Sequence, residues 1–269
     1  EKKKLIISSI SQLNGKKIEK FSFRKKAEID KAILDIKDKK FNISDISSKV
    51  VSRNPLGPFT TSTLQQVSSS RLGFGASRTM QIAQKLYQGI EIDGETIGLI
   101  TYMRTDGTNL AADAISDFRD FIKNEYGKEY LPENPLSYSG KKAKNAQEAH
   151  EAIRPTDISR SPNSVKKYLN TDQQKLYNLI WGRALSSQME TAKFDRNTIT
   201  ITSHDNDTIC KTSGSVLKFD GFLRVFPNSN KDDDEVVLPE MTKGLVNIEA
   251  LVDEQHFTQP PPRFSEASL

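Results

Sequence analysis

Apolar and polar side chains alternate with a period of two residues near both ends of the chain, a pattern typical of half-buried β-strands. Near the start, two such runs flank Asn14-Gly15, and this pair between alternating runs is a strong hairpin signal. Near the end, Thr198–Thr202 alternates strictly. The predicted strands are residues 4–10, 18–23, 198–202, 236–238 and 246–252.

Helical spacing replaces this alternation between about residues 58 and 191. Gly73 is expected to end the first helix of this region, and Ser77 to cap the second, which Gly89 closes. The predicted helices are residues 60–72, 78–88, 111–126, 146–153 and 171–189, with a short one in the N-terminal part at 31–36.

The apolar faces of two of these helices indicate what they bury. In the second helix, Met80, Ala83, Leu86 and Tyr87 recur at helical spacing, so we expect all four to face a core. The last helix carries Asp172 in its first turn, where an acidic side chain suits the helix dipole. Its apolar face comprises Leu176, Ile180, Trp181, Ala184 and Leu185.

A second hairpin is expected inside the helical region. Asp93-Gly94 lies between the apolar runs 90–92 and 96–101, and this dipeptide favours a tight turn between two strands. The predicted hairpin delivers Tyr102 at the end of its second strand.

Strand-rich ends around a helical middle predict an α+β fold in which one domain is inserted into another. We expect residues 1–57 and 192–269 to form one β-rich domain, and residues 58–191 to form a mainly α-helical domain. The run Pro260–Pro262 breaks regular structure near the end.

Composition excludes several classes of protein. The apolar fraction of 35% is well above that of a disordered chain, and no apolar run approaches the roughly 20 residues of a membrane span. The N-terminal apolar patch is too short for a signal peptide. Cys210 is the only cysteine, so an internal disulfide and a cysteine-rich zinc site are excluded. A piece of a larger protein is the expectation, because no initiator Met is present, and a cytoplasmic origin fits the single cysteine.

Positive charge is concentrated near the start of the chain. The net charge is +4, but residues 1–50 hold 14 basic and 7 acidic side chains. Such a segment can follow a phosphate backbone. An ordinary solvated surface is the alternative interpretation of most of these lysines.

Tyr102 and Arg104 form the first chemical candidate. In an extended segment, residues two positions apart point to the same face, so a phenol and a guanidinium would face one phosphate. A phenol oxygen can attack phosphorus while the guanidinium holds the phosphate oxygens in a bidentate grip. A buried strand-end tyrosine beside an exposed arginine is the structural alternative.

His150 and Arg154 form the second candidate. Their spacing of four places both side chains on one face if the segment is helical, and the pair would make an anion site that responds to pH. Arginine cannot bind a metal, so the spacing is not that of a zinc protease. The alternative is a surface helix in which Glu148 or Glu151 pairs with Arg154.

A third segment holds hydroxyls around the start of a predicted helix. Thr61, Ser62 and Thr63 could add donors to a helix N-terminus that binds anions, although plain N-capping explains them as well. Arg71 and Arg78 flank the following turn and could reach a DNA backbone.

The motifs resemble those of bacterial type IA DNA topoisomerases over nearly the whole chain. ITYMRTD, residues 100–106, resembles the active-site segment of that family, and QEAHEAIRPT, residues 147–156, resembles its second active-site helix. The other similar segments are NPLGPFTTSTLQQ, ASRTMQIAQKLYQG, KLYNLIW and FTQPPPRFSEASL.

This resemblance implies a role for each matching residue. Tyr102 matches the nucleophile that cuts one strand and keeps its 5′-phosphate as a phosphotyrosine. Arg104 matches the arginine at the scissile phosphate, while His150 and Arg154 match residues that position DNA and the active site. His150 is also a candidate for taking the phenol proton. The residues expected to contact DNA are Arg104, Thr61, Ser62, Thr63, Arg78 and Gln147.

The resemblance also implies an architecture and an activity. The family is a torus in which a β-rich arch works as a gate for an α-rich domain carrying the tyrosine. The whole enzyme would relax negative supercoils without ATP, by cutting one strand, passing another and resealing. We expect single-stranded, negatively supercoiled DNA as its partner, bound in a salt-sensitive way. A monomer in the bacterial cytoplasm, associated with the nucleoid and not with a membrane, is expected.

Two departures from the family pattern limit these expectations. Gly107 stands where the family usually has serine after Thr-Asp, so one hydroxyl is missing beside the site. The acidic domain that binds magnesium should precede this segment. Residues 232–235 lack the alternating acidic spacing and are interpreted as a loop. We therefore assign no metal ligand here, expect magnesium to bind elsewhere in the full-length enzyme, and expect this chain alone not to relax DNA.

Two other functions stay open on the sequence. A tyrosine recombinase also combines Tyr, His and Arg, but its tyrosine follows the other groups and its second motif is His-x-x-Arg. A non-catalytic DNA-binding module could use a helix together with the Asp93-Gly94 hairpin as a wing.

Overall fold

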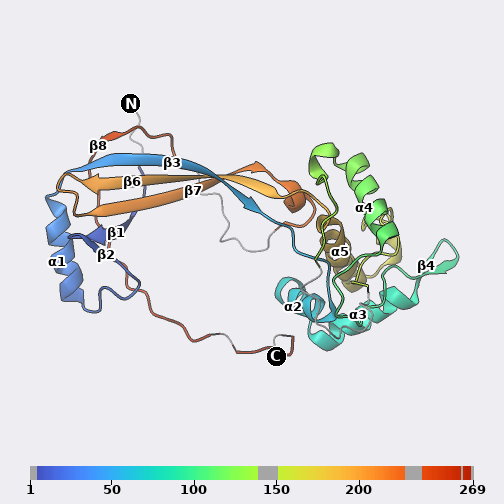
Figure 1. Ribbon diagram of the computed structural model, residues 1–269. Helices are drawn as coiled ribbons and strands as arrows, with labels where there is room; N and C mark the ends of the chain where they lie inside the picture. The colour runs from blue at the N-terminus through green and yellow to red at the C-terminus, as the bar shows by residue number, and fades with distance from the viewer. Residues whose placement is uncertain (1–4, 139–150, 228–237, 262, 268–269) are drawn as a thin grey trace, which may run out of the picture. The chain divides into compact units, whose positions relative to one another are not determined.

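The computed structural model describes residues 5–138, 151–227, 238–261 and 263–267. Both helices and strands are present, as the α+β prediction requires (Figure 1). Contacts divide the described residues into two units. A sheet unit comprises residues 5–52, 193–219 and 238–261, and a helical unit comprises residues 53–138, 151–192, 220–227 and 263–267.

The sheet unit combines strands from both ends of the chain. Its strand order is β2-β1-β7-β6-β3-β8. The N-terminal strand β1 pairs antiparallel with β7, and β7 pairs antiparallel with β6 along nearly its whole length. The strands are β1 (Ser9–Leu13), β2 (Lys16–Lys17), β3 (Phe41–Arg53), β6 (Ala192–Ser203), β7 (Ile209–Phe219) and β8 (Gly244–Val246).

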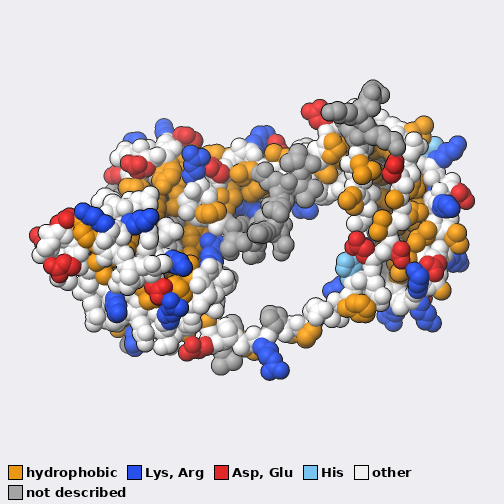
Figure 2. All heavy atoms as spheres, turned by 180° about the vertical axis from the view of Figure 1, so that it is seen from behind, with side chains coloured by type: hydrophobic (Ala, Val, Ile, Leu, Met, Phe, Trp, Pro, Cys, Tyr) orange, Lys and Arg blue, Asp and Glu red, His pale blue; other side chains and the backbone are white. Residues whose placement is uncertain are grey.

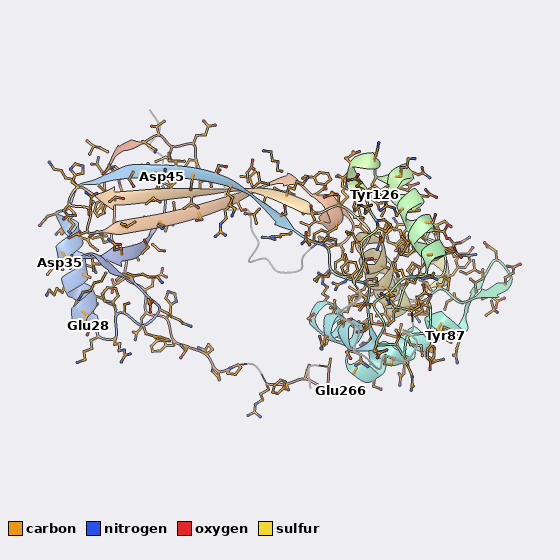
Figure 3. All side chains as sticks on the ribbon, viewed as in Figure 1. Glu28, Asp35, Asp45, Tyr87, Tyr126 and Glu266 are labelled. Atoms are coloured by element: carbon orange, nitrogen blue, oxygen red, sulfur yellow. The ribbon has the colours of Figure 1, made fainter. Side chains whose placement is uncertain are left out.

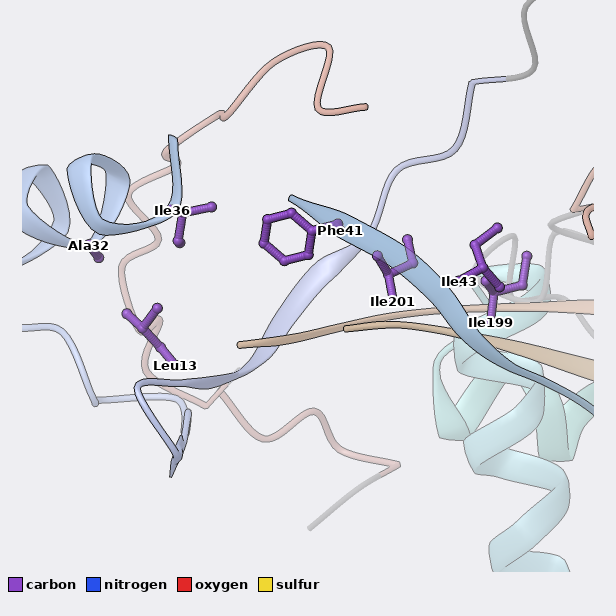
Figure 4. Close-up of a cluster of buried hydrophobic side chains, with 7 residues drawn as sticks. All are labelled: Leu13, Ala32, Ile36, Phe41, Ile43, Ile199 and Ile201. Atoms are coloured by element: carbon purple, nitrogen blue, oxygen red, sulfur yellow. The ribbon is translucent and has the colours of Figure 1, made fainter. Parts of the chain in front are cut away.

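One apolar cluster forms the core of this unit (Figure 4). The helix α1 (Lys26–Lys37) contributes residues spaced by four, and the strands contribute residues spaced by two, as each periodicity requires. Each fully buried side chain of this size stabilises the fold by about 1.5–3 kcal/mol relative to exposure. The cluster comprises Leu13, Ala32, Ile36, Phe41, Ile43, Ile199 and Ile201.

The Asn14-Gly15 turn is confirmed, but its flanking strands differ from the prediction. Both residues have positive φ, 48° and 73°, which the tight hairpin turn needs. The strands lie directly beside the turn instead of at residues 4–10 and 18–23, because β1 takes its register from β7. The Asn14 side chain donates to Asp35 at 3.2 Å, and Figure 3 labels Asp35 on α1.

Other strand and helix predictions in this unit are partly wrong. The alternating run Thr198–Thr202 lies within β6 as expected. Among the described residues 238–261, only Gly244–Val246 forms a strand, so the prediction of a strand at 246–252 is wrong beyond Val246. The strand β7 was not predicted, because its polar residues and Gly214 weaken the alternation. The helix α1 is longer than the predicted 31–36, since Glu28 accepts hydrogen bonds from the Arg24 and Lys25 amides at its start. The predicted strand at 236–238 falls mostly outside the described residues.

The helical unit holds four α-helices, a small hairpin and short 3₁₀ turns among its described residues (Figure 1). The Asp93-Gly94 hairpin is confirmed, although its second strand ends before Thr101. The elements are α2 (Thr61–Leu72), α3 (Ala76–Gln88), β4 (Ile90–Ile92), β5 (Glu95–Ile97), α4 (Ala112–Glu125), η1 (Lys128–Tyr130), η2 (Lys166–Tyr168), α5 (Thr171–Ser186) and η3 (Gly221–Arg224).

The helix α5 lies at the centre of this unit. Its predicted apolar face is buried throughout, and its N-terminus is capped by Asn170, which accepts from the Gln173 amide at 2.9 Å. Two predictions for α3 are wrong. The helix begins at Ala76, after Gly75, so Ser77 lies in its first turn and is not the cap. Tyr87 is 41% exposed, although Ala83 and Leu86 of the same helix are fully buried.

The units differ from the expected domain segments at several places. Residues 53–57, 192, 220–227 and 263–267 lie with the helices instead of the strands. The segment 220–227 is held because the Phe222 amide donates to the Glu190 carbonyl at 2.9 Å. A side chain at Gly221 would collide with that carbonyl, at 2.5 Å from a Cβ, and its φ of 48° also favours glycine.

The surface charge and the hydropathy of the helices bear on two of the expectations from composition. On the face drawn in Figure 2, basic and acidic side chains are interspersed on the surface of each unit. This mixture supports the interpretation of many N-terminal lysines as an ordinary solvated surface. In the part of the chain that the structure describes, no helix has the length and apolar character needed to cross a bilayer.

Candidate active site at Tyr102

Tyr102 lies in an extended segment between β5 and α4. Exposed and buried side chains alternate along it: Tyr102, Arg104 and Asp106 are exposed, whereas Met103 and Thr105 are buried. Tyr102 is 49% exposed, so the alternative of a buried strand-end tyrosine is wrong. The segment is not the end of the hairpin strand, because β5 already stops at Ile97. Because Met103 and Thr105 are buried, Tyr102 and Arg104 nevertheless face solvent on the same side of the segment.

Thr61, the first residue of α2, fixes this segment. Its hydroxyl lies 2.8 Å from the Met103 carbonyl and 3.0 Å from the Thr105 carbonyl, and it donates its one hydrogen to either. It also accepts from the Thr105 amide at 2.8 Å, and the Thr61 amide donates to the Thr105 carbonyl at 2.9 Å. The backbone on both sides of Arg104 is therefore tied to the start of a helix.

The second motif lies directly beside the first. The Thr101 amide donates to the Arg154 carbonyl at 2.9 Å, and the Arg154 amide donates to the Thr101 hydroxyl at 3.0 Å. The Thr101 hydroxyl donates to the Ala152 carbonyl at 2.8 Å. The fold thus brings together two segments that the sequence separates by about fifty residues.

The described part of the second motif is not helical. Ile153 forms an isolated antiparallel bridge with Phe59, and Glu151 forms an isolated parallel bridge with Asn109. Ala152 and Ile153 are both fully buried. The predicted helix is therefore wrong at residues 151–153, and its other residues, with His150 and Gln147, lie outside the described part.

The guanidinium of Arg154 is used inside the protein. Its Nε donates to Glu151 Oε1 at 2.6 Å, and its Nη1 donates to the Pro155 carbonyl at 2.9 Å. The same Glu151 oxygen accepts from the Ala111 amide at 2.9 Å. The ion pair with Glu151, which the sequence analysis left as the alternative, is present, and only 15% of the Arg154 side chain is exposed.

Two of the three predicted hydroxyl contacts to DNA are also engaged within the chain. Thr63 lies in a capping box with Thr60, in which each backbone amide donates to the other side chain. Thr61 holds the Tyr102 segment as described above. Ser62 is exposed. Arg78 is 54% exposed and donates to Asp172 at 2.6 and 3.1 Å.

The Tyr102 ring has an aromatic neighbour. Tyr87 projects from the last turn of α3 (Figure 3), and its ring lies edge to face against Tyr102 with centroids 5.3 Å apart. The periodicity of α3 placed Tyr87 in the core, and nothing in that pattern indicates this contact. Gly107, at the position of the missing hydroxyl, is buried, and its amide donates to the Thr105 hydroxyl at 3.0 Å.

Comparison with known proteins assigns the family. A family model described as DNA topoisomerase matches residues 3–269. The chain belongs to the bacterial type IA DNA topoisomerase family. This confirms the resemblance that the motifs indicated.

Topoisomerases in two groups of bacteria illustrate the similarity. The DNA topoisomerase 1 of Rickettsia typhi is 45% identical over 269 residues, covering 98% of this chain and 34% of that protein. The DNA topoisomerase 1 of Xylella fastidiosa is 42% identical over 273 residues, covering 97% of this chain and 33% of that protein. The chain thus spans about a third of the length of these relatives.

A solved topoisomerase shares the fold. The structure of full-length topoisomerase I from Thermotoga maritima superimposes with a TM-score of 0.70 at 32% identity, covering 89% of this chain and 36% of that one. In the described part of this topoisomerase chain, no three His, Cys, Asp or Glu side chains gather as a metal site would require.

Proposed function

We propose that Tyr102 is the nucleophile of a topoisomerase that cleaves one DNA strand and keeps it as a 5′-phosphotyrosine. The observation that carries this proposal is the half-exposed phenol on the same side of an extended segment as the exposed Arg104. The phenol oxygen forms a bond to phosphorus, the bond from phosphorus to the 3′ oxygen breaks, and that oxygen leaves. The phenol loses its proton to a base, and the 3′ oxygen gains one.

Arg104 supports this step electrostatically. A guanidinium presents paired donors to phosphate oxygens and strengthens its contact as negative charge develops on them. The four hydrogen-bond contacts between Thr61 and the backbone of Met103 and Thr105 hold the segment in place. Attack by the freed 3′ hydroxyl on the phosphotyrosine reverses the reaction and reseals the strand.

For the longer enzyme we propose strand passage between cleavage and resealing, which relaxes negative supercoils without ATP. Its partner is single-stranded DNA held mainly through the backbone, and it acts as a monomer. Magnesium belongs to this proposal only through residues of the longer enzyme that lie outside this chain, so no step here is assigned to it. The 269-residue chain alone should not relax a supercoiled plasmid, whereas the longer protein should; relaxation by the chain alone contradicts this.

Covalent trapping tests the nucleophile. The protein that carries this chain is mixed with an end-labelled single-stranded oligonucleotide, denatured with detergent, and any adduct is mapped to its residue and DNA end. We expect an adduct between Tyr102 and a 5′ phosphate. Tyr102→Phe should abolish it and leave DNA binding largely intact, while the matched variant Tyr87→Phe should keep it.

The same experiment separates the alternatives. A 3′-linked adduct would favour a tyrosine recombinase. Absence of any adduct from the wild-type protein would favour a non-catalytic DNA-binding module.

A further inference from the structure

A cavity of about 220 Å³ lies in the helical unit, away from the Tyr102 segment. Its lining includes Arg71 in the last turn of α2, Arg183 in the last turn of α5, and Phe226, which follows η3. None of the residues from 101 to 107 lines it. The cavity therefore does not belong to the candidate active site.

The two arginines are held against one aromatic ring. The Arg71 guanidinium lies 4.2 Å from the Phe226 centroid, and the Arg183 guanidinium lies 5.5 Å from it. Arg183 also donates from Nε to the Gly57 carbonyl at 2.6 Å and is only 8% exposed. Two cations are thus fixed beside each other at the wall of one cavity.

Neither arginine is neutralised by the residues that the structure describes, because no carboxylate there pairs with either. Burial, together with a smaller effect of the positive charge of Arg71, lowers the pKa of Arg183 to about 10. Burial likewise lowers the pKa of Arg71. Ring faces and the carbonyl ends of two helices favour cations, but they supply no full negative charge. Buried charges in proteins are normally paired.

We propose that this cavity binds a phosphate group between Arg71 and Arg183. Planar guanidinium groups present forked donors that match the oxygens of a phosphate. The volume is large enough for an oxyanion with several waters, since one water needs about 10–15 Å³. The phosphate belongs either to the DNA backbone or to a free phosphate compound, and the two arms of the experiment distinguish these sources.

The first arm uses inorganic phosphate as the probe. The protein that carries this chain is titrated at constant ionic strength, and broadening of the phosphate ³¹P resonance is measured. We expect saturable broadening that Arg71→Gln abolishes and Arg71→Lys retains in part. Arg196→Gln, which removes an exposed charge from β6, is the matched control and should leave the broadening unchanged.

The second arm measures binding of a single-stranded oligonucleotide at several salt concentrations. Loss of one phosphate contact should reduce the slope of log K against log salt by about 0.7 for a single strand. A reduced slope in Arg71→Gln, but not in Arg196→Gln, identifies a DNA phosphate. An unchanged slope with lost ³¹P broadening identifies a free phosphate compound.

Two results would overturn the proposal. One is that neither the ³¹P signal nor the salt slope responds specifically to Arg71, as expected if a carboxylate of the protein occupies the cavity. The other is that Arg196→Gln causes the same loss, which would indicate non-specific surface charge. Thermal unfolding of each variant checks that the fold is retained. Covalent trapping at Tyr102 is measured in the same variants. Unchanged trapping shows that a failed phosphate proposal is distinct from failure of the proposed nucleophile.

Discussion

Tyr87 and Tyr102 meet edge to face, with ring planes inclined by 63°. A backbone hydrogen bond supports this contact, because the Leu99 amide donates to the carbonyl of Leu86, the neighbour of Tyr87, at 2.8 Å. The end of α3 and the approach to Tyr102 are therefore attached at two points. One side of the proposed nucleophile is restrained while its other side stays open to solvent.

Removing the Tyr87 ring should loosen Tyr102. An aromatic pair contributes about 0.5–1.5 kcal/mol, so Tyr87→Ala should slow covalent trapping by roughly 2–10-fold, at 1.4 kcal/mol for each tenfold change. Tyr87→Phe keeps the ring and should trap at the wild-type rate. The measurement is the rate of adduct formation with a labelled oligonucleotide. Equal rates for Tyr87→Ala and wild type would show that the ring contact does not position Tyr102.

Thr61→Val tests the attachment of the Tyr102 segment to α2. The valine side chain has a similar shape but no hydroxyl, so the Thr105 amide loses its acceptor. We expect about 1–3 kcal/mol lower stability, measured by urea unfolding, together with slower trapping. Thr61→Ser should restore both, and Ser62→Ala, at the exposed neighbouring position, should change neither. Full trapping activity in Thr61→Val would contradict a positioning role.

Local signals predicted most elements of the helical unit, because they act within a few residues. Gly73 and Gly89 end their helices as predicted, and the face of α5 follows from its period alone. Tyr87 shows the limit of this reasoning. Its position on α3 satisfies the helical period, yet the helix ends one residue later and the neighbouring surface is the Tyr102 segment, which periodicity does not reveal.

Residues of the second motif were harder to predict for a different reason. Glu151 and Arg154 suit a helix by spacing, but the segment pairs with distant positions instead: the Ala152 amide donates to the Asn109 carbonyl and the Arg154 carbonyl accepts from the Thr101 amide. Such long-range pairing outweighs a weak local helical preference. The contact between the two motifs could be inferred only from the family resemblance. Arg183 was overlooked because it lies inside an otherwise buried helix.

The two arginines near Tyr102 should respond differently to the same substitution. Arg104 is exposed, so Arg104→Gln should lower covalent trapping with little effect on the melting temperature. Arg154 holds Glu151 and is mostly buried, so Arg154→Gln leaves a carboxylate without its partner. Hydrogen bonds to charged groups contribute about 1.5–3 kcal/mol, so a melting temperature several degrees lower is expected. Thermal unfolding measures this, and equal stability of the two variants would contradict the assignment.

Tyr138 should make the stability of the chain fall at alkaline pH. Burial raises its pKa to about 12 against a smaller opposing effect of Arg183, and its hydroxyl donates to the Ser187 carbonyl at 3.0 Å. The folded state therefore prefers the protonated phenol. This contribution is fully present below about pH 10, the ordinary tyrosine pKa, and is lost as the pH rises through about 12.

The variant Tyr138→Phe isolates this effect, because it removes both the hydrogen bond and the titration. At neutral pH it should be about 1 kcal/mol less stable than wild type. That difference should shrink as the pH increases above about 10, since only the wild type pays the cost of deprotonating a buried phenol. Urea unfolding at a series of pH values measures both proteins. A difference that stays constant across this range would show that Tyr138 titrates alike in the folded and unfolded states.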